Sequence, residues 1–348
     1  MSGLSFSVPC LAPALLGAAI TLAASAQNVA MPPSTTASQP HDQSLADANS
    51  ALQAGEADKA LALLGAMPSS GPAQAKKLNL LCRVHYMLEQ FDAAATACEQ
   101  AVRLDEQNSD YHLWLGRALG ERAARASFMN AFSLAKRTRA EFEEAVRINP
   151  ANVEALASLG DFYRQAPGVV GGGVDKAQAI AADLDKVDPA RALELRGNIF
   201  EQQKDLTTAE KDFKQATTSG AHPAQAWTSL ASFYGRRHQF TDMESAVHSA
   251  MNAALHDRHS SVALYDGAGL LIEYNRNPSL AATMLDDYLA GASKTEDAPA
   301  FIAHIRLARL KQQSGDTAAA DRERAAAQAL ARDYKPASKD SRSQATNP

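Results

Sequence analysis

A pattern of large and small apolar residues occurs twice in the middle of this chain, 34 residues apart. In each copy the order large, small, large is followed by small, large, small at helical spacing. The two sets are Leu193, Gly197, Phe200, Leu206, Ala209, Phe213 and Ala216, and then Trp227, Ala231, Tyr234, Phe240, Met243, Val247 and Ala250. This period is that of two short antiparallel helices, so the pattern predicts a helical repeat array.

The same period extends outward in both directions, and eight helix pairs fit between residues 44 and 334. The first pair begins near Ser44 and turns at Gly55, and the last pair turns at Gly315. Charged residues flank the second helix of the last pair, which is typical of a solvent-facing end cap. Alanine is abundant and runs of Val, Ile and Thr are scarce, which favours helix over sheet.

Two consecutive pairs are longer than the period predicts. The third pair closes ten residues late, and its extra residues lie within Gly120–Arg139. The fourth closes five residues late because of the segment Ala166–Gly173, where glycine and proline force a loop. A phosphate-binding loop is the alternative for this segment, but no Gly-Lys-Ser/Thr follows it and a helix precedes it where a strand is required.

The repeats resemble those of the tetratricopeptide repeat family, whose signature is Trp-x2-Leu-Gly-x2-Tyr followed by Ala-x3-Phe-x2-Ala. Here Trp227, Leu230, Ala231 and Tyr234 match the first part, and Ala209, Phe213 and Ala216 of the preceding copy match the second. The resemblance implies an all-α, right-handed superhelical solenoid of about eight helix-turn-helix repeats over residues 44–334. Its concave inner face is expected to bind a protein or peptide.

The first 41 residues carry no charged side chain, and Leu11–Leu22 is mostly apolar. Ala24-Ser25-Ala26 has the small-x-small form of a cleavage site, so residues 1–26 are predicted to be a signal peptide cut after Ala26. The protein is then periplasmic or secreted. Too little apolar sequence precedes Cys10 for a lipoprotein anchor, and no other segment is long and apolar enough to span a membrane.

The composition of the flanking segments predicts a flexible linker over residues 27–43 and a disordered tail over residues 335–348. Charged residues make up 21% of the chain and hydrophobic residues 46%, as in globular proteins. The formal net charge of −5 gives no case for nucleic acid or an anionic membrane surface as a partner.

Cys82 and Cys98 are the only cysteines that remain after cleavage, and both lie in the second repeat. On facing helices in an oxidising compartment they are candidates for a disulfide. The alternative is a pair of small core residues that never approach each other.

The third repeat is locally basic, and a basic groove suits a carboxylate or an acidic segment of a partner. The candidate partner-binding residues on the first helices are Arg117, Arg122, Arg125, Arg164, Arg196 and Arg236. The alternative is an ordinary solvated helix face. The asparagines of the chaperone-binding members of the family are not evident, so their carboxylate clamp is not carried over.

These features predict a non-catalytic scaffold or adaptor of the cell envelope without a cofactor or metal. No nucleophile elbow, His-Glu-x-x-His or defined acid pair is present in the sequence. His256 and His259 are spaced for a shared metal, although a turn with exposed polar residues is the simpler interpretation. The alternatives are an enzyme or small-ligand binder whose site is formed by the insertions at 120–140 and 166–174, and a structural spacer without a ligand.

Overall fold

The computed structural model describes residues 40–220, 223–257, 260–291 and 293–335. The predicted signal peptide, most of the predicted linker and nearly all of the predicted tail lie outside the described residues. Within them the chain forms sixteen α-helices and the short 3-10 helix η1 (Gly168–Val170), with no strand. The all-helical fold class is therefore confirmed.

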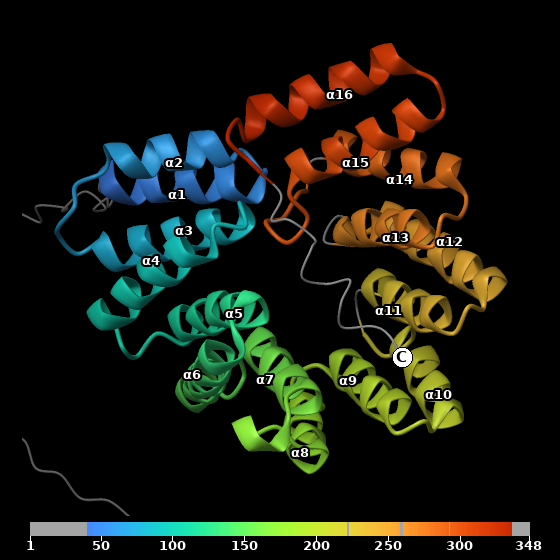
Figure 1. Ribbon diagram of the computed structural model, residues 1–348, viewed down its shortest axis with the longest axis horizontal. Coiled ribbons are helices and arrows are strands. Elements are labelled where there is room, and N and C mark those ends of the chain that lie inside the picture. Colours follow the sequence, from blue (N-terminus) through green and yellow to red (C-terminus); the bar gives the residue numbers. More distant parts are fainter. Residues whose placement is uncertain (1–39, 221–222, 258–259, 292, 336–348) are drawn as a thin grey trace, which may run out of the picture. The chain divides into compact units, whose positions relative to one another are not determined.

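The helices form eight successive antiparallel pairs (Figure 1). They are α1 (Pro40–Gln53) with α2 (Ala57–Ala66), α3 (Gln74–Met87) with α4 (Phe91–Leu104), α5 (Ser109–Arg125) with α6 (Phe128–Ile148), α7 (Val153–Gln165) with α8 (Val174–Leu184), α9 (Pro189–Gln202) with α10 (Leu206–Ala216), α11 (Pro223–Arg236) with α12 (Phe240–His256), α13 (Val262–Glu273) with α14 (Pro278–Ala290), and α15 (Ala300–Gln313) with α16 (Thr317–Leu330).

The pairs are arranged in two layers. From α1 to α13, each odd-numbered helix contacts the next odd-numbered helix as well as its own partner, so these helices form an inner layer. The even-numbered helices pack outside them, as Figure 1 shows. This is the solenoid that the 34-residue period predicts.

Small residues on the first helix of a pair allow its partner to approach closely. A Cβ atom added to Gly116 would lie 2.5 Å from the ring of Phe142, and one added to Gly197 would lie 2.9 Å from the ring of Phe213. The small positions at Gly116 and Gly197 are thus contact points between the two helices of their repeats.

The turn within a repeat uses one backbone conformation repeatedly. In the second repeat the Gln90 amide donates to the His85 carbonyl and the Glu89 amide to the Tyr86 carbonyl, both at 2.9 Å, which is a Schellman ending with Glu89 in the left-handed region. Corresponding residues with positive φ close the first helix in six repeats: Gly55, Glu89, Lys204, His238, Asn275 and Gly315. The sequence indicated the two glycine turns and not the four non-glycine ones.

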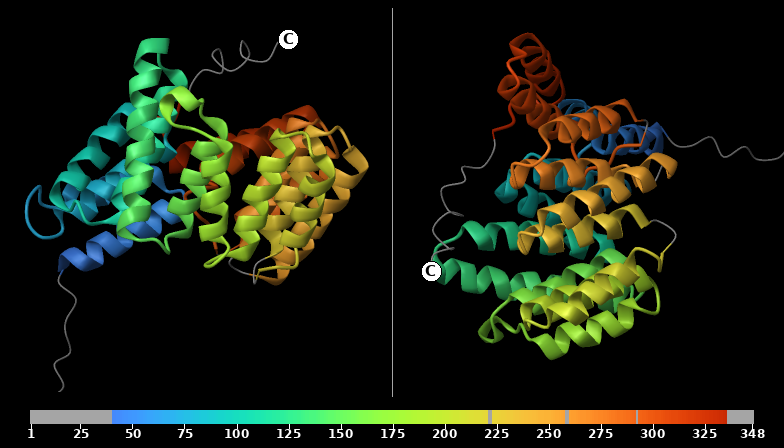
Figure 2. Two further views of the ribbon diagram at one scale, coloured as in Figure 1. Left: turned by 90° about the horizontal axis from the view of Figure 1, so that it is seen from below. Right: turned by 90° about the vertical axis from the view of Figure 1, so that its right-hand side faces the viewer.

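Three details differ from the sequence-based expectation. Helix α1 starts at Pro40 rather than near Ser44, inside the segment predicted to be a linker. The extra residues of the third repeat, predicted within 120–139, lengthen its helices to 17 and 21 residues, beyond the length that the regular period predicts. In the left view of Figure 2 the green α6 rises above the neighbouring helices.

The third difference is that the last pair does not end the array as a free cap. Leu52 and Leu64 of the first pair share one apolar cluster with Phe301 and Ala327 of the last pair. We call this junction the closing contact, because it joins the two ends of the array. The exposed charged face of α16 still points to solvent, as its sequence predicts, while the opposite face is covered.

Polar contacts accompany the apolar cluster of the closing contact. Glu296, in the segment before α15, accepts hydrogen bonds from Arg83 Nε at 2.8 Å and from Gln53 Nε2 at 3.2 Å. The Tyr334 hydroxyl donates to Glu89 at 2.8 Å. Both ends of the helical array therefore bury surface that a free solenoid end would expose.

Gly55 and Gly315 provide a matched test of the closing contact. Both have positive φ, so an alanine at either position costs about 1–2 kcal/mol of backbone strain. A Cβ at Gly55 would also lie 2.5 Å from the Ala300 amide nitrogen, whereas nothing lies within 4 Å of one at Gly315. We expect Gly55→Ala to lower the free energy of unfolding by about 1–3 kcal/mol more than Gly315→Ala in urea titrations. Equal losses would contradict the closing contact.

Candidate functional site

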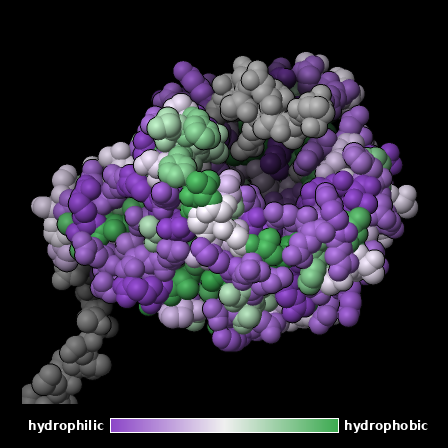
Figure 3. Space-filling model, turned by 60° about the horizontal axis from the view of Figure 1, so that its bottom comes forward, coloured by the Kyte–Doolittle hydropathy of each residue, from purple (hydrophilic) through white to green (hydrophobic). Residues whose placement is uncertain are grey.

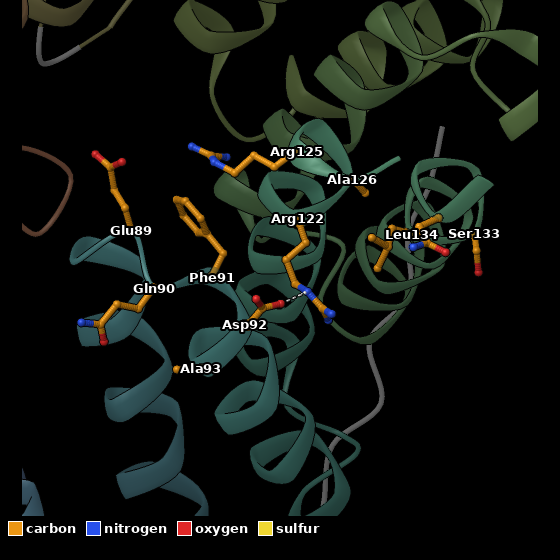
Figure 4. Close-up of a pocket in the computed structure, with 11 residues that line it drawn as sticks. Glu89, Gln90, Phe91, Asp92, Ala93, Arg122, Arg125, Ala126, Ser133 and Leu134 are labelled. Carbon is orange, nitrogen blue, oxygen red and sulfur yellow. Dashed lines mark ion pairs between the residues drawn. The ribbon is translucent and has the colours of Figure 1, made fainter. Parts of the chain in front are cut away.

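A pocket of about 880 Å³ lies between the turn of the second repeat and the insertion of the third (Figure 4). Its walls come from the turn before α4, the first turn of α4, the end of α5 and the first half of α6. The lining residues are Glu89, Gln90, Phe91, Asp92, Ala93, Arg122, Arg125, Ala126, Asn130, Ser133 and Leu134.

The length of α5 determines where the positively charged side chains of the pocket, Arg122 and Arg125, lie. The helix begins at Ser109 because the Asn108 side chain accepts hydrogen bonds from the Asp110 and Tyr111 amides, at 3.1 and 3.4 Å. It continues for 17 residues, against 14 for α3 and 13 for α7. Arg122 and Arg125 occupy this extra turn, so the insertion itself brings them beside α4.

The two pocket arginines are held by neighbours on the same wall. Arg122 Nε lies 2.7 Å from an oxygen of Asp92, whose side chain is 90% exposed. Arg125 pairs with Glu121 and stacks over the Phe91 ring at 4.3 Å from the ring centroid. Figure 4 shows the Arg122–Asp92 pair between Phe91 and Leu134, with Arg125 beside Phe91.

An apolar tip adjoins the pocket. Phe128 and Met129, in the first turn of α6, are 85% and 77% exposed, and the next residue, Asn130, lines the pocket. Large exposed apolar side chains next to each other are uncommon on a soluble surface and mark interaction sites. Figure 3 shows one face of the molecule, on which patches of apolar residues interrupt a largely hydrophilic surface.

A second cluster lies on the inner layer around Trp114 of α5. The guanidinium groups of Arg83 and Arg117 lie 5.5 and 4.8 Å from the Trp114 ring centroid, and Tyr86 meets the ring edge-on. Burial raises the pKa of Tyr86 to about 12, with a smaller contribution from the Glu121 carboxylate. Arg117 also pairs with Glu154 at 2.5 Å.

Sequence reasoning missed Arg83, Trp114 and Glu296. The sequence contained an indication of Arg83, because Arg83 and Arg117 are 34 residues apart and occupy the same position of successive repeats. Glu296 lies in a connecting segment, where no repeat position marks it. The arginines of this cluster are balanced by Glu296 and Glu154, so it is a paired polar network rather than a basic groove.

Buried carboxylates continue along the inner layer. Burial raises the pKa of Glu194, which faces Arg191 at 3.6 Å, and raises the pKa of Asp266, which accepts a hydrogen bond from Gln225 at 3.2 Å. These groups prefer the protonated form more than free carboxyls do.

The remaining predicted arginines are not brought together. Arg164 pairs with Asp161 at 2.9 Å, Arg196 with Asp212 at 3.1 Å, and Arg236 with Glu201 at 2.6 Å. The three arginines lie on three different repeats, and the Arg236–Glu201 pair bridges the fifth and sixth. Of the six candidates, Arg122 and Arg125 line the pocket, and Arg117 belongs to the Trp114 cluster.

The structure joins Cys82 of α3 to Cys98 of α4 by a disulfide, with their Cα atoms 5.2 Å apart. Both residues are fully buried. The bond links the two helices whose turn forms one wall of the pocket.

The two insertions contact each other without sharing this pocket. Arg139 of α6 donates to the Val170 carbonyl at 3.3 Å, but no residue of 166–174 lines the pocket.

The two histidines spaced for a shared metal are not both described. His256 Nδ1 lies 2.7 Å from the Asn252 carbonyl oxygen, and His259 lies outside the described residues. In the part of the chain that is described, no three His, Cys, Asp or Glu side chains are placed to hold a metal ion.

Eight stacked helix pairs with small residues at the contacts define a helical-repeat protein. The α9–α10 pair, residues 190–219, matches the family model of the tetratricopeptide repeat. One helix pair of this chain therefore matches the tetratricopeptide repeat, and the other seven pairs share its two-helix form.

Solved structures of similar proteins include a thermophilic tetratricopeptide repeat protein of Thermus thermophilus. It is 19% identical with a TM-score of 0.42, and the match covers 57% of this chain and 99% of that one. A tetratricopeptide repeat protein of Parabacteroides merdae is 12% identical with a TM-score of 0.43, covering 78% and 98% of the two chains. None of the curated proteins compared with the chain matches it.

The hairpin that carries the site has a pH-dependent contact at its base. His112 of α5 places Nδ1 2.7 Å from Glu141 of α6 and Nε2 3.1 Å from the Glu106 carbonyl oxygen. Burial lowers the pKa of His112, but the hydrogen bonds to these two acceptors outweigh it, and the pKa is raised.

Because the folded-state pKa is raised, the stability from this contact is fully present below the unfolded pKa of about 6.5 and is lost as the pH rises through the folded pKa. We expect His112→Gln to lower the melting temperature clearly at about pH 6 and much less at about pH 9. Thermal melts of both proteins across this range test it. A difference that grows with pH would contradict the assignment.

Proposed function

We propose that this protein is an exported scaffold of the cell envelope that binds a protein or peptide partner at the pocket and the apolar tip of its third repeat. The observation that carries the proposal is the position of Phe128 and Met129, exposed beside a pocket that holds Arg122 and Arg125. Helical repeat arrays in general present extended surfaces for such partners.

The sizes of the two features suit a macromolecular ligand. A pocket of about 880 Å³ can take several side chains of a docked segment. Burying an exposed phenylalanine or methionine side chain contributes about 1.5–3 kcal/mol, and such side chains often anchor interfaces. The network around Trp114 offers less, because the Trp114 ring is buried and the side chains of Arg83 and Arg117 are less exposed than those of Arg122 and Arg125.

The lining of the pocket favours binding over catalysis. It contains no histidine or cysteine, and its one hydroxyl side chain, Ser133, is exposed on α6. The alternative of a small-ligand site enclosed by both insertions would need residues 166–174 in the pocket wall. We therefore propose a scaffold rather than an enzyme.

Export is supported by two separate features. The leader has the apolar stretch and the Ala24-Ser25-Ala26 site of a signal peptide. The Cys82–Cys98 disulfide suits an oxidising compartment. Among the described residues, no helix combines the length and the apolar character that a membrane span requires.

Cell fractionation followed by N-terminal sequencing tests export. We expect the mature protein in the envelope fraction or the medium, beginning at Gln27 because cleavage follows the small residues Ala24 and Ala26. Alkylation should label Cys82 and Cys98 only after reduction. An uncleaved chain in the cytoplasm, with both thiols reactive, would refute this part of the proposal.

Site-specific photocrosslinking in intact cells tests the binding surface. A photoreactive residue at Phe128 is expected to crosslink one reproducible partner, because this side chain is 85% exposed beside the pocket. Leu255, 55% exposed on α12, is the matched control position. The crosslink from 128 should weaken strongly when Arg122→Glu is added.

The same adducts from positions 128 and 255, or none from 128, would refute the proposed surface. The absence of any adduct from position 128 would favour the alternative of a structural spacer without a ligand.

A further inference from the structure

We propose that the pocket selects an acidic segment of its partner, with a carboxylate bound between Arg122 and Arg125 and a neighbouring apolar side chain packed on Phe128 and Met129. This inference rests on the proposed function and adds the chemistry of the ligand. It follows from the guanidinium N–H groups of Arg122 and Arg125 that donate to no acceptor among the described residues.

The guanidinium groups have donors to spare. An arginine carries five N–H donors. Arg125 donates from Nη1 to Glu121, and Arg122 forms an ion pair with Asp92 through Nε. The structure shows no acceptor among the described residues for the remaining donors of either side chain. Because Asp92 is 90% exposed, its pair with Arg122 contributes little to stability and mainly orients the guanidinium group.

The α4 N-terminus adds positive potential to the same wall. Phe91, Asp92 and Ala93 are the first three residues of this 14-residue helix, and all three line the pocket. Gln90 precedes them and makes no side-chain capping hydrogen bond to the first-turn amides. The positive end of the helix dipole and two guanidinium groups together favour an anion.

The acidic residues of the lining are already engaged. Asp92 forms an ion pair with Arg122, and Glu89 accepts a hydrogen bond from the Tyr334 hydroxyl at 2.8 Å. A cationic ligand would have to compete with these donors, whereas a carboxylate adds to donors that have capacity left. Charge complementarity therefore favours an acidic ligand over a basic one.

The apolar tip distinguishes a peptide segment from a small anion. A free carboxylate would satisfy the arginines and leave Phe128 and Met129 in water. A segment with an apolar residue next to Asp or Glu covers both features, and it fits a pocket of about 880 Å³. The ligand is thus an acidic, apolar stretch of a protein chain.

Selection from a random 12-residue peptide display library on the immobilised mature protein tests the inference. We expect the enriched peptides to carry Asp or Glu beside Phe, Leu or Met. Synthetic versions of the enriched peptides, labelled with fluorescein, should bind at least about tenfold more tightly than versions with Lys in place of the acids. Their affinity should fall with added salt.

Variants with matched controls locate the contacts. Arg122→Gln with Arg125→Gln should weaken binding at least about tenfold, whereas Arg147→Gln should not. Arg147 is an arginine of the same repeat that pairs with Glu144 on the surface. Phe128→Ser with Met129→Ser should weaken binding, whereas Leu104→Ser, at a site that is 53% exposed, should not. Circular dichroism melts confirm that each variant is folded.

The outcomes separate this inference from the proposed function. Enrichment of basic peptides that still require Phe128 would overturn the acidic preference and leave the binding surface in place. Enrichment unaffected by the arginine substitutions, or no enrichment at all, would overturn the inference. Absence of both enrichment and a crosslinked partner would overturn the proposed function as well.

Discussion

Close helix–helix contact within each pair is the interaction on which this structure depends. Gly116 and Gly197 lie so near the rings of Phe142 and Phe213 that a methyl group would not fit. The contact makes a rigid unit, but one pair buries too little apolar surface to be stable alone. Each pair therefore needs neighbours on both sides, and the two end pairs have the greatest need. In this chain the closing contact gives each end pair a second neighbour, because Leu52 and Phe301 share one apolar cluster.

Closure changes which surface is available to a partner. In an open solenoid the first helices of the repeats present their polar residues to a ligand along the inner layer. Here Arg83 reaches Glu296 across the closing contact, and Arg117 is bound to Glu154. Displacing these half-buried ion pairs would leave charges unpaired, which is costly. The insertion of the third repeat carries its arginines and apolar residues away from this network, so it adds a surface that the closed array lacks.

The period allowed the pairs to be predicted, because each repeat is a local unit whose small and large positions are visible in the sequence. It also located the insertion and the candidates Arg122 and Arg125. The turns at Glu89 and Lys204 were not visible, since neither residue favours positive φ and the repeat context imposes it. The closing contact was not predictable either. The residues that meet there, such as Gln53 and Glu296, are separated by most of the chain and share no repeat position.

The Cys82–Cys98 disulfide stabilises the same helix turn that forms one wall of the pocket. Cys82 and Cys98 join α3 to α4, and the turn between these helices supplies Glu89, Phe91 and Asp92 to the pocket. Glu89 is held further by Tyr334 from the other end of the chain. The wall formed by the turn between α3 and α4 is thus fixed by a covalent bond and by the closing contact. The opposite wall is formed by the long α5–α6 hairpin. A wall ordered before binding loses less conformational entropy when a ligand docks. Reduction of the disulfide should consequently weaken binding at the pocket even though neither sulfur touches the ligand.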